Sequence, residues 1–539
     1  MPGTHDIANQ PPPLVGYDVF SADAALVEGV RRHQAGPHET HLVALGQRAG
    51  SEEALGWGVA ANTNPPVLRT HDRYGHRIDE VEFHPAWHQL LEVATGHGLH
   101  ASPWREPGTG AHVARAAGFY VWSQAEGGHG CPVSMTHAAV PALRAEPALA
   151  AEWEPKLTAY SYDALLRPIA EKTSALAGMG MTEKQGGSDV RANTTRAVAQ
   201  PDGSYLLTGH KWFTSAPMCD VFLVLAQAPE GLTCFLVPRV LPDGTRNTFR
   251  IQRLKDKLGN RSNASSEPEF DNTVAWRVGD EGRGVRTIIE MVNMTRLDCV
   301  IGSASLMRRA VAEATHHAAH RRAFGAYLID QPLMQNVLAD LAVESEAATV
   351  LMLRLAAATD DDESALRRVA LAAGKYWVCK RGPTLAAEAL ECLGGNGYVE
   401  DFPLAALYRE APLNSIWEGS GNANALDVLR AMQREPECLA AFDAEVALAV
   451  GADARLDAAA GKLRSDLAAI GDDQSGARRL VEQMAIVLQG SLLVRFGHPA
   501  VADAFAATRL GGDWGHAFGT LPRGADVRAI VDRATPKLG

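Results

Sequence analysis

Side chains of four chemical kinds occur along the chain in an order that could serve one large ligand. Thr182 and Ser188 carry hydroxyls which, like bare backbone N–H groups, can bond ring or pyrophosphate oxygens. Trp212 offers an aromatic wall, and Arg321 offers a planar guanidinium fork that suits phosphate. Glu418 is a carboxylate, which acts as a base near neutral pH when burial raises its pKa.

Each of these residues also has an ordinary structural explanation when it is taken alone. Gly186 and Gly187 before a serine and an aspartate are typical of a simple turn. A tryptophan in a strand is most often part of the core, and an arginine commonly ends a helix. Glu418 precedes a Gly-Ser pair and could lie in a surface turn. The residues therefore indicate a function only as a set.

As a set, five stretches resemble the flavin site of the acyl-CoA dehydrogenase superfamily. They are Met181-Thr182-Glu183-Lys184-Gln185-Gly186-Gly187-Ser188-Asp189, Lys211-Trp212-Phe213-Thr214-Ser215, Arg321-Arg322-Ala323-Phe324-Gly325, Leu393-Gly394-Gly395-Asn396-Gly397-Tyr398 and Ile416-Trp417-Glu418-Gly419-Ser420. Lys184 stands where the family usually has proline, which loosens the turn without removing a donor or an acceptor. The glycines of the fourth stretch lack the spacing of a dinucleotide fingerprint, so a Rossmann domain is not expected.

The resemblance implies FAD as the cofactor and a homo-oligomer, expected as a dimer of dimers. In this family the arginine and phenylalanine of the third stretch reach the flavin of a neighbouring subunit, and the glycines of the fourth approach it across the same interface. A helix C-cap turn is a compatible explanation of those glycines. The implied cofactor-binding residues are Met181, Thr182, Gly187, Ser188, Trp212, Phe213, Thr214, Arg321, Phe324, Gln331, Gln335, Gly394, Gly395, Ser420 and Asn422.

The resemblance also implies the catalytic residues. Glu418 corresponds to the family's base, which takes the α-proton of an acyl thioester while the β-hydrogen leaves as hydride to flavin N5. Arg296 corresponds to an arginine near the base, where it could tune Glu418 or simply pair with a buried acid. Trp417 replaces the usual tyrosine and should crowd the acyl pocket, which favours short, branched or unusual acyl groups.

A metal site is not expected. His316, His317 and His320 cluster in one stretch, but no cysteine or carboxylate pair stands at ligand spacing beside them.

The elements that must position these residues change in kind along the chain. Helical spacing is evident in Phe83 to Gly96, whose apolar residues recur every three or four positions. Short β-prone runs bounded by turn residues follow, at 204–209, 220–226 and 233–238. Long helical periodicity returns from Gly284. The pattern predicts helices, then strands, then helices.

The predicted fold class is α+β with the acyl-CoA dehydrogenase architecture. Residues 1–177 form an N-terminal extension and helical domain, and residues 178–283 form a small middle β-barrel or sandwich domain. Residues 284–435 form a C-terminal four-helix-bundle domain, and residues 436–539 form a helical C-terminal extension. That extension lies beyond the point where ordinary members of the resembled family end.

Composition limits the function classes. The chain has 539 residues, 46% of them hydrophobic, and no apolar run approaches the ~20 residues that cross a bilayer. Its start shows no export signal, and its seven cysteines have no Cys-x-x-Cys spacing, so a cytoplasmic enzyme with no membrane partner is expected. The net charge of -12 argues against a surface that tracks nucleic acid throughout.

Within the superfamily, the long N-terminal lead and the C-terminal extension most resemble the adaptive alkylation-response (AidB-type) branch. Members of that branch are associated with DNA and with protection from alkylating agents. The favoured function is therefore an FAD-dependent oxidoreductase acting on an acyl thioester or an analogue, with an electron-transfer flavoprotein or oxygen as acceptor. A flavin-containing protein bound to double-stranded DNA is one alternative, although residues 442–539 hold 12 acidic and 11 basic residues. Oxidation of an amine on the same scaffold is the other.

Overall fold

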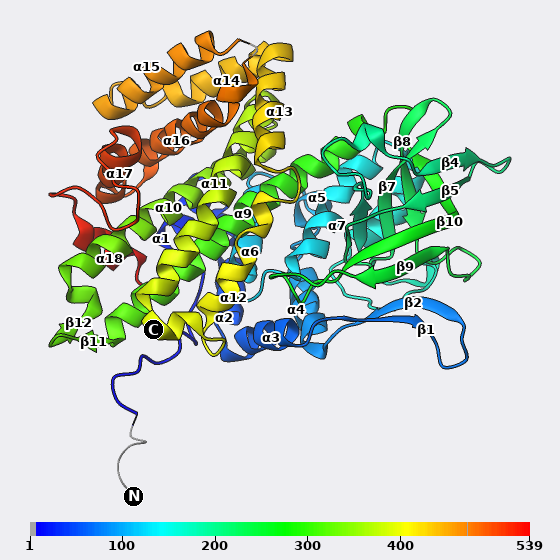
Figure 1. The fold of residues 1–539 in the computed structure, drawn as a ribbon, viewed down its shortest axis with the longest axis horizontal. Coiled ribbons are helices and arrows are strands. Elements are labelled where there is room, and N and C mark those ends of the chain that lie inside the picture. The colour runs from blue at the N-terminus through cyan, green and yellow to red at the C-terminus, as the bar shows by residue number, and fades with distance from the viewer. Residues whose placement is uncertain (1–6, 472, 539) are drawn as a thin grey trace, which may run out of the picture. The chain divides into compact units, whose positions relative to one another are not determined.

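The computed structural model describes residues 7–471 and 473–538, and the chain forms two compact units (Figure 1). The helical unit comprises residues 1–52, 112–124 and 299–539, and the mixed unit comprises residues 53–111 and 125–298. Neither unit follows one continuous stretch of sequence. The division of the chain at residues 177, 283 and 435 remains a prediction.

The mixed unit begins with helices, as the sequence predicts, but also contains a hairpin that the sequence analysis missed. Strands β1 (Val67–His71) and β2 (Arg77–Glu82) pair antiparallel. Their turn is held by Asp72, whose carboxylate accepts the backbone N–H groups of Tyr74 and His76. The helices of this part are α3 (Glu52–Thr63), α4 (Pro85–Gly96), α5 (Ser102–Arg105), α7 (Gly130–Leu143), α8 (Pro147–Leu157) and the short η2 (Ile169–Glu171). The helix expected within residues 83–96 is confirmed.

A barrel of eight strands forms the rest of the mixed unit and confirms the predicted middle β domain, in which β5, β7 and β8 match the three β-prone runs. The eight strands are β3 (Ala177–Gly180), β4 (Arg196–Ala199), β5 (Tyr205–His210), β6 (Thr214–Ser215), β7 (Val221–Ala228), β8 (Gly231–Pro238), β9 (Phe249–Leu254) and β10 (Ser265–Val278). Pairing runs from β7 to β8, β10, β5, β4 and back to β7, which closes the ring. A closed ring leaves no free sheet edge on those strands.

The core of the barrel is built from apolar strand residues and phenylalanine rings. The run Val221-Phe222-Leu223-Val224-Leu225-Ala226 is buried on both faces, which is why it is continuously apolar instead of alternating. Phe222 stacks on Phe249, and Phe249 also contacts Phe270. Strand β3 adds to β7 in parallel, so the chain leaves the barrel at Gly180 directly beside this core.

Long helices build the helical unit, confirming the periodicity that the sequence shows from Gly284. They are α9 (Gly284–His320), α10 (Pro332–Asp360), α11 (Ser364–Cys392), α12 (Pro403–Glu410) and α13 (Gly421–Arg434). Helix α11 packs on α10 and α13, and the Ser303 hydroxyl of α9 reaches Cys379 Sγ of α11 at 3.3 Å. Helices α1 (Ala24–Arg32), α2 (Glu39–Ala49) and α6 (Ala111–Ser123) also belong to this unit.

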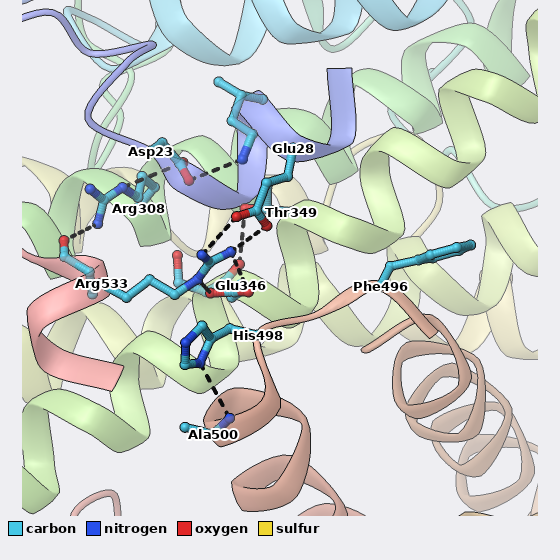
Figure 2. A network of polar contacts seen from close by, with 12 residues as sticks. Asp23, Glu28, Arg308, Glu346, Thr349, Phe496, His498, Ala500 and Arg533 are labelled. Carbon is cyan, nitrogen blue, oxygen red and sulfur yellow. Dashed lines mark hydrogen bonds and ion pairs between the residues drawn. The ribbon is translucent and has the colours of Figure 1, made fainter. Parts of the chain in front are cut away.

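The C-terminal extension is helical and packs on α10 and α11. It consists of α14 (Pro436–Ala447), α15 (Ala454–Ala469), α16 (Ala477–Phe496), α17 (Pro499–Phe505) and α18 (Val527–Ala534). Ion pairs fasten it, since Arg354 of α10 donates to Glu445 of α14 at 2.8 Å. Arg533 of α18 lies between Glu28 of α1 and Glu346 of α10, as Figure 2 shows.

Short elements and caps complete the chain. The short helices are η1 (Gly36–His38), η3 (Val190–Ala192), η4 (Leu328–Asp330), η5 (Gly394–Tyr398), η6 (Leu413–Ser415), η7 (Gln474–Gly476) and η8 (Ala506–Leu510), and β11 (Arg322–Ala323) pairs with β12 (Ala326–Tyr327). All seven cysteines are unpaired and buried, as expected for scattered thiols. Among the described residues, no helix combines the length and the apolar character that a membrane span requires.

Candidate active site

The mixed unit brings together the first two sequence stretches. Strand β3 ends at Gly180, and Met181 to Ser188 follow as a turn whose glycines are exposed. The backbone N–H of Trp212 donates to the carbonyl of Thr182 at 2.9 Å, so the two stretches run side by side. A Cβ atom added to Gly187 would stand 2.4 Å from Thr182 Oγ1, which explains the glycine there. Thr182 and Gly187 therefore form one compact corner, with Ser188 exposed next to it.

A buried ion pair that the sequence analysis did not identify fixes this corner. Lys211 Nζ lies 2.8 Å from Glu183 Oε1, and neither side chain is exposed to solvent. Burial alone would raise the pKa of Glu183, but the Lys211 charge and hydrogen bonds from Gln185 and Thr194 hold that pKa well below its usual range. Burial lowers the pKa of Lys211 to about 8. Both residues belong to the recognised motifs, Glu183 to the first and Lys211 to the second, but only folding brings them together.

Trp212, Phe213 and Thr214 occupy three different environments. Trp212 is half-buried and lies in the link between β5 and β6, so the prediction that it belongs to a strand is wrong. Phe213 is 53% exposed. The ammonium of Lys255 lies 3.6 Å from the centre of the Trp212 ring and 4.3 Å from that of Phe213, which places a positive charge against both rings.

Thr214 is the residue of this stretch that most directly indicates a ligand. Its hydroxyl is buried and has no hydrogen-bond partner among the described residues. A buried hydroxyl without a partner costs about 1–3 kcal/mol, so such groups normally have a reason. Gly180 lies close by, because a Cβ atom built on it would be 3.7 Å from Thr214 Oγ1. A polar atom of a flat cofactor against Trp212 would satisfy this hydroxyl, so the residues present fit the expected flavin.

A hollow of about 540 Å³ lies elsewhere on the mixed unit, around the start of α9. Three arginines line it together with apolar side chains, and none of the three forms an ion pair within the described chain. Gln227 contributes an amide, which donates to the carbonyls of Arg191 and Asn193. The lining residues are Arg191, Gln227, Leu232, Gly282, Arg283, Val285, Arg286 and Ile289. Such a lining suits an anionic ligand with an apolar part.

Arg296 lies further along α9 and is buried, with 8% of its surface exposed. It belongs to the mixed unit, and the acidic residue two positions on, Asp298, is buried too.

The helical unit carries Glu418 in an uncommon backbone conformation. Glu418 is half-buried with φ of 57°, in the left-handed region that non-glycine residues rarely occupy, and Gly419 follows with φ of 94°. The carbonyls on both sides of Glu418 accept hydrogen bonds from one ammonium, that of Lys375 on α11. Such conformations persist where the surroundings enforce them, and they concentrate at functional sites.

The neighbours of Glu418 are fixed by further hydrogen bonds. Trp417 Nε1 donates to Asn414 Oδ1 at 2.9 Å, so the indole is held in place. The buried Asn424 amide donates to the carbonyls of Gly419 and Ser420 at 2.6 and 3.0 Å. Ser420 is the N-cap residue of α13, and Asn422 is exposed in the first turn of that helix.

The third and fourth stretches lie close together in the helical unit. Strands β11 and β12 form a hairpin whose two turn residues, Phe324 and Gly325, both have positive φ, of 51° and 85°. Asn9 bonds the Arg321 side chain and the Arg322 backbone, and its neighbour Gln10 accepts from the Asn396 amide of η5. The hairpin and the glycine turn are therefore both bonded to the same segment, Asn9 and Gln10.

These stretches present their implied cofactor residues outward. Phe324 is 99% exposed, and Gly394 and Gly395 are exposed as well. Gln331 is the N-cap residue of α10 and donates to the carbonyl of Ala323, and Gln335 is half-buried in the first turn of that helix. Groups on such an outward face can act on a ligand held by another copy of the chain.

The histidine cluster near the end of α9 has ordinary partners. The rings of His316 and His320 stand 4.3 Å apart, and His316 Nε2 lies 2.9 Å from the carbonyl oxygen of Pro12. Within the described chain, the one group of side chains with metal-ligand spacing is elsewhere, at Glu435, Glu437 and Cys438. Clustered acidic groups are common without an ion, and this group carries no metal assignment.

Comparison with known protein families gives three matches that cover most of the chain. Residues 9–164 match the adaptive response protein AidB N-terminal domain, residues 178–273 match the acyl-CoA dehydrogenase middle domain, and residues 282–433 match the acyl-CoA dehydrogenase C-terminal domain. The Escherichia coli (strain K12) protein AidB, which carries the name of an acyl-CoA dehydrogenase, is 45% identical over 94% of both chains.

Solved structures agree with these matches. Caenorhabditis elegans ACDH-11 in complex with C11-CoA superposes with a TM-score of 0.85 at 26% identity, over 99% of this chain and 94% of that one. An acyl-CoA dehydrogenase complexed with FAD from Bacillus anthracis shares the fold, with a TM-score of 0.62 at 19% identity, over 84% of this chain and 79% of that one.

Proposed function

Because this chain belongs to the AidB-type branch of the acyl-CoA dehydrogenase family, we propose that it is an FAD-dependent oxidoreductase that removes two hydrogens from an acyl thioester, with Glu418 as the base. Family membership makes it an oxidoreductase of CH–CH donors. The observation that carries the assignment of Glu418 is its backbone, which neighbouring residues hold in a left-handed conformation at the family's base position.

The chemistry requires a proton acceptor, a hydride acceptor and orientation. The Glu418 carboxylate takes the α-proton, and the electron pair left on the α-carbon forms the new double bond as the β-hydrogen departs with its own pair. FAD, when bound, accepts that hydride. The substrate is thereby oxidised by two electrons, which leave the protein to an electron-transfer flavoprotein or to oxygen.

For the flavin we propose the corner formed by Met181, Thr182, Gly187 and Ser188, with Trp212, Phe213 and Thr214 against the ring. The unsatisfied Thr214 hydroxyl supports this assignment. Ser420 and Asn422 of the helical unit are the further cofactor residues that the family resemblance implies. From a second subunit we propose Arg321 as the phosphate ligand, with Phe324, Gln331, Gln335, Gly394 and Gly395 beside it, in a homo-oligomer built as a dimer of dimers.

For the substrate we propose a short, branched or unusual acyl group on coenzyme A. The Trp417 indole is larger than the family's usual tyrosine, and its hydrogen bond to Asn414 prevents it from turning away freely. The arginine-lined hollow of the mixed unit suits the phosphates of the thioester's nucleotide. The C11-CoA bound to the C. elegans relative shows that a longer chain fits a related scaffold, so chain length must be measured.

The visible spectrum of the purified protein tests the proposal. We expect flavin absorption that bleaches anaerobically with short or branched acyl-CoAs and more slowly with long straight ones. A yellow protein that no acyl-CoA bleaches would refute thioester oxidation. Bleaching by an amine alone would favour oxidation of a nitrogen substrate on the same scaffold.

A second candidate function rests on the match of residues 9–164 to the adaptive-response domain. In it the protein binds double-stranded DNA and protects it from alkylating agents, with flavin bound. A mobility shift of duplex DNA that weakens steeply with salt would support this function, and no shift at low salt would remove it.

A further inference from the structure

The chain contains a buried lysine that the proposed reaction does not yet use. Lys375 lies in the middle of α11 and is 1% exposed. Its ammonium donates to two acceptors, the carbonyl of Trp417 at 2.7 Å and the carbonyl of Gly419. Within the described chain it has no carboxylate partner. We propose that Lys375 is a positioning residue that sets the direction of the Glu418 side chain, an inference that rests on the proposed function of Glu418.

The cost of burying this charge is the first argument. Moving an ammonium out of water costs several kcal/mol even after the protein relaxes. A methionine of similar length would fill the same space in α11 without that cost. Neighbouring positions of the helix, from Val369 to Gly374, are buried and uncharged, so a lone lysine there needs a reason beyond packing.

The geometry supplies the reason. The two carbonyls that Lys375 bonds belong to the residues directly before and after Glu418. Their peptide planes therefore turn toward one point, and Glu418 between them takes φ of 57°. The bonded planes are the Trp417–Glu418 and Gly419–Ser420 peptides, so the segment that carries the Cα–Cβ bond of Glu418 is restrained at both ends. A base must reach its proton within hydrogen-bond distance, and an error of about 1 Å can cost about 100-fold in rate.

A second contact restrains the same loop from the other side. The Asn424 amide, fully buried in α13, also donates to the Gly419 carbonyl. Gly419 thus accepts from one group on α11 and one on α13. Asn424 bonds the carbonyls of Gly419 and Ser420, so among the described residues Lys375 is the one side chain that bonds carbonyls on both sides of Glu418.

Lys375→Met tests the proposal. We expect the variant to fold and retain FAD, with KM within about 3-fold of wild type and kcat lowered about 10- to 100-fold. Lys375→Arg, which keeps the charge and the donors, should recover part of the loss. Lys462→Met, at an exposed lysine of α15, is the matched control and should behave as wild type. Wild-type kcat in Lys375→Met would overturn the proposal.

Two measurements distinguish a loss of Glu418 positioning from a general loss of structure, and they do so independently of the proposed function. A 3-oxoacyl-CoA has an acidic α-carbon, so Glu418 can remove its proton although no oxidation follows. The ionised ligand gives a long-wavelength absorption band when it is bound beside the flavin. We expect this band to weaken in Lys375→Met. A crystal structure of the variant should show Glu418 outside the left-handed region. If Glu418 keeps φ near the wild-type value in this structure, the inference about Lys375 fails. This result does not depend on turnover, whereas a wild-type protein that oxidises no thioester would refute the proposed function.

Lys375→Met removes a donor from the carbonyls of Trp417 and Gly419, of which only Gly419 keeps the Asn424 amide, and the variant could unfold. In that event Lys375→Gln carries the test, because its amide can still bond one carbonyl. It should shift kcat and the ionisation band in the same direction by a smaller factor. Wild-type values for Lys375→Gln in both measurements would overturn the inference.

Discussion

Glu418 is the residue on which the proposed chemistry depends most directly. Glu418→Gln keeps the side-chain shape but cannot take the α-proton, so we expect FAD content and thermal stability near wild type and turnover lowered at least about 100- to 10,000-fold. Stopped-flow bleaching with the best acyl-CoA measures the loss. Equal bleaching rates in Glu418→Gln and wild type would assign the base to another residue.

The sequence predicts the motif residues of this site better than it predicts the residues that hold them in place. Thr182, Trp212 and Glu418 are visible in the sequence because each stands in a local motif. Lys375 and the pair of Glu183 with Lys211 were missed, because their partners lie 28 or more positions away and meet only in the fold. The available signal was a charged residue directly after a buried, uncharged stretch of a helix, as for Lys375 after residues 369–374, or within a motif, as for Glu183 and Lys211.

Among the elements, the loop around Glu126 offers a test by pH. The buried Glu126 carboxylate accepts from the Gly128 and His129 backbones, the Asn62 amide and the Ser262 hydroxyl, so it joins α3 to the loop before β10. Burial alone would raise its pKa, but the bonds from His129 and Asn62 outweigh burial and lower the pKa to about 2.

A depressed carboxyl pKa gives stability that is complete above the unfolded pKa and is lost as pH falls toward the folded one. For Glu126 that window runs downward from about pH 4.5, and the full contribution is about 3 kcal/mol. Glu126→Gln should therefore lower Tm at pH 7, with a gap from wild type that narrows as pH falls toward 3. Parallel curves of Tm against pH would contradict this. Glu154→Gln, whose partner Arg144 is exposed, is the control.

The predictability of elements follows their burial. Strands β7 and β8 are mostly apolar and buried and were predicted to within a few residues, and so was α4. The hairpin of β1 and β2 was not, because its residues are mostly exposed or half-buried and leave no apolar alternation. Trp212 shows the opposite error, because its link between two strands resembles a strand in composition.

At the scale of the whole molecule, the C-terminal extension is predicted to stabilise the helical unit through Arg533. This residue donates to Glu346 at 2.9 Å and to Glu28 at 2.7 Å (Figure 2). Burial raises the pKa of Glu346, whereas the hydrogen bond from Arg533 lowers the pKa of Glu28. Removing the arginine therefore leaves one mostly buried acid without its partner.

Arg533→Met should destabilise the protein by about 3 kcal/mol, because an unpaired buried charge costs about 3–5 kcal/mol and Glu346 keeps some access to water. The added change Glu346→Leu should restore most of the loss. Arg528→Met, on the same helix but with exposed partners, should change stability by less than about 1 kcal/mol. Thermal unfolding followed by circular dichroism measures all three. Equal losses of stability in Arg533→Met and Arg528→Met would show that the ion pairs of Arg533 do not stabilise the helical unit more than exposed ones.

The proposed homo-oligomer predicts that exposed apolar residues of the helical unit contact a second copy of the chain. Phe324, Leu333 and Tyr398 are 99%, 86% and 84% exposed. Large exposed apolar side chains that lie close together mark interaction sites, and Asn9 with Gln10 ties the Phe324 hairpin to the turn that holds Tyr398. The proposed flavin ligands Arg321 and Gly394 belong to these two elements.

Assembly and cofactor binding should therefore fail together. Phe324→Asp should lower the mass found by analytical ultracentrifugation and weaken FAD binding at least about 10-fold, because the arginine of one subunit would no longer reach the flavin of the next. Val450→Asp, at an exposed residue between α14 and α15, should change neither. A Phe324→Asp protein that stays assembled and yellow would show that this hairpin lies outside the interface. A smaller protein that keeps its FAD would show that each subunit binds flavin with its own residues alone.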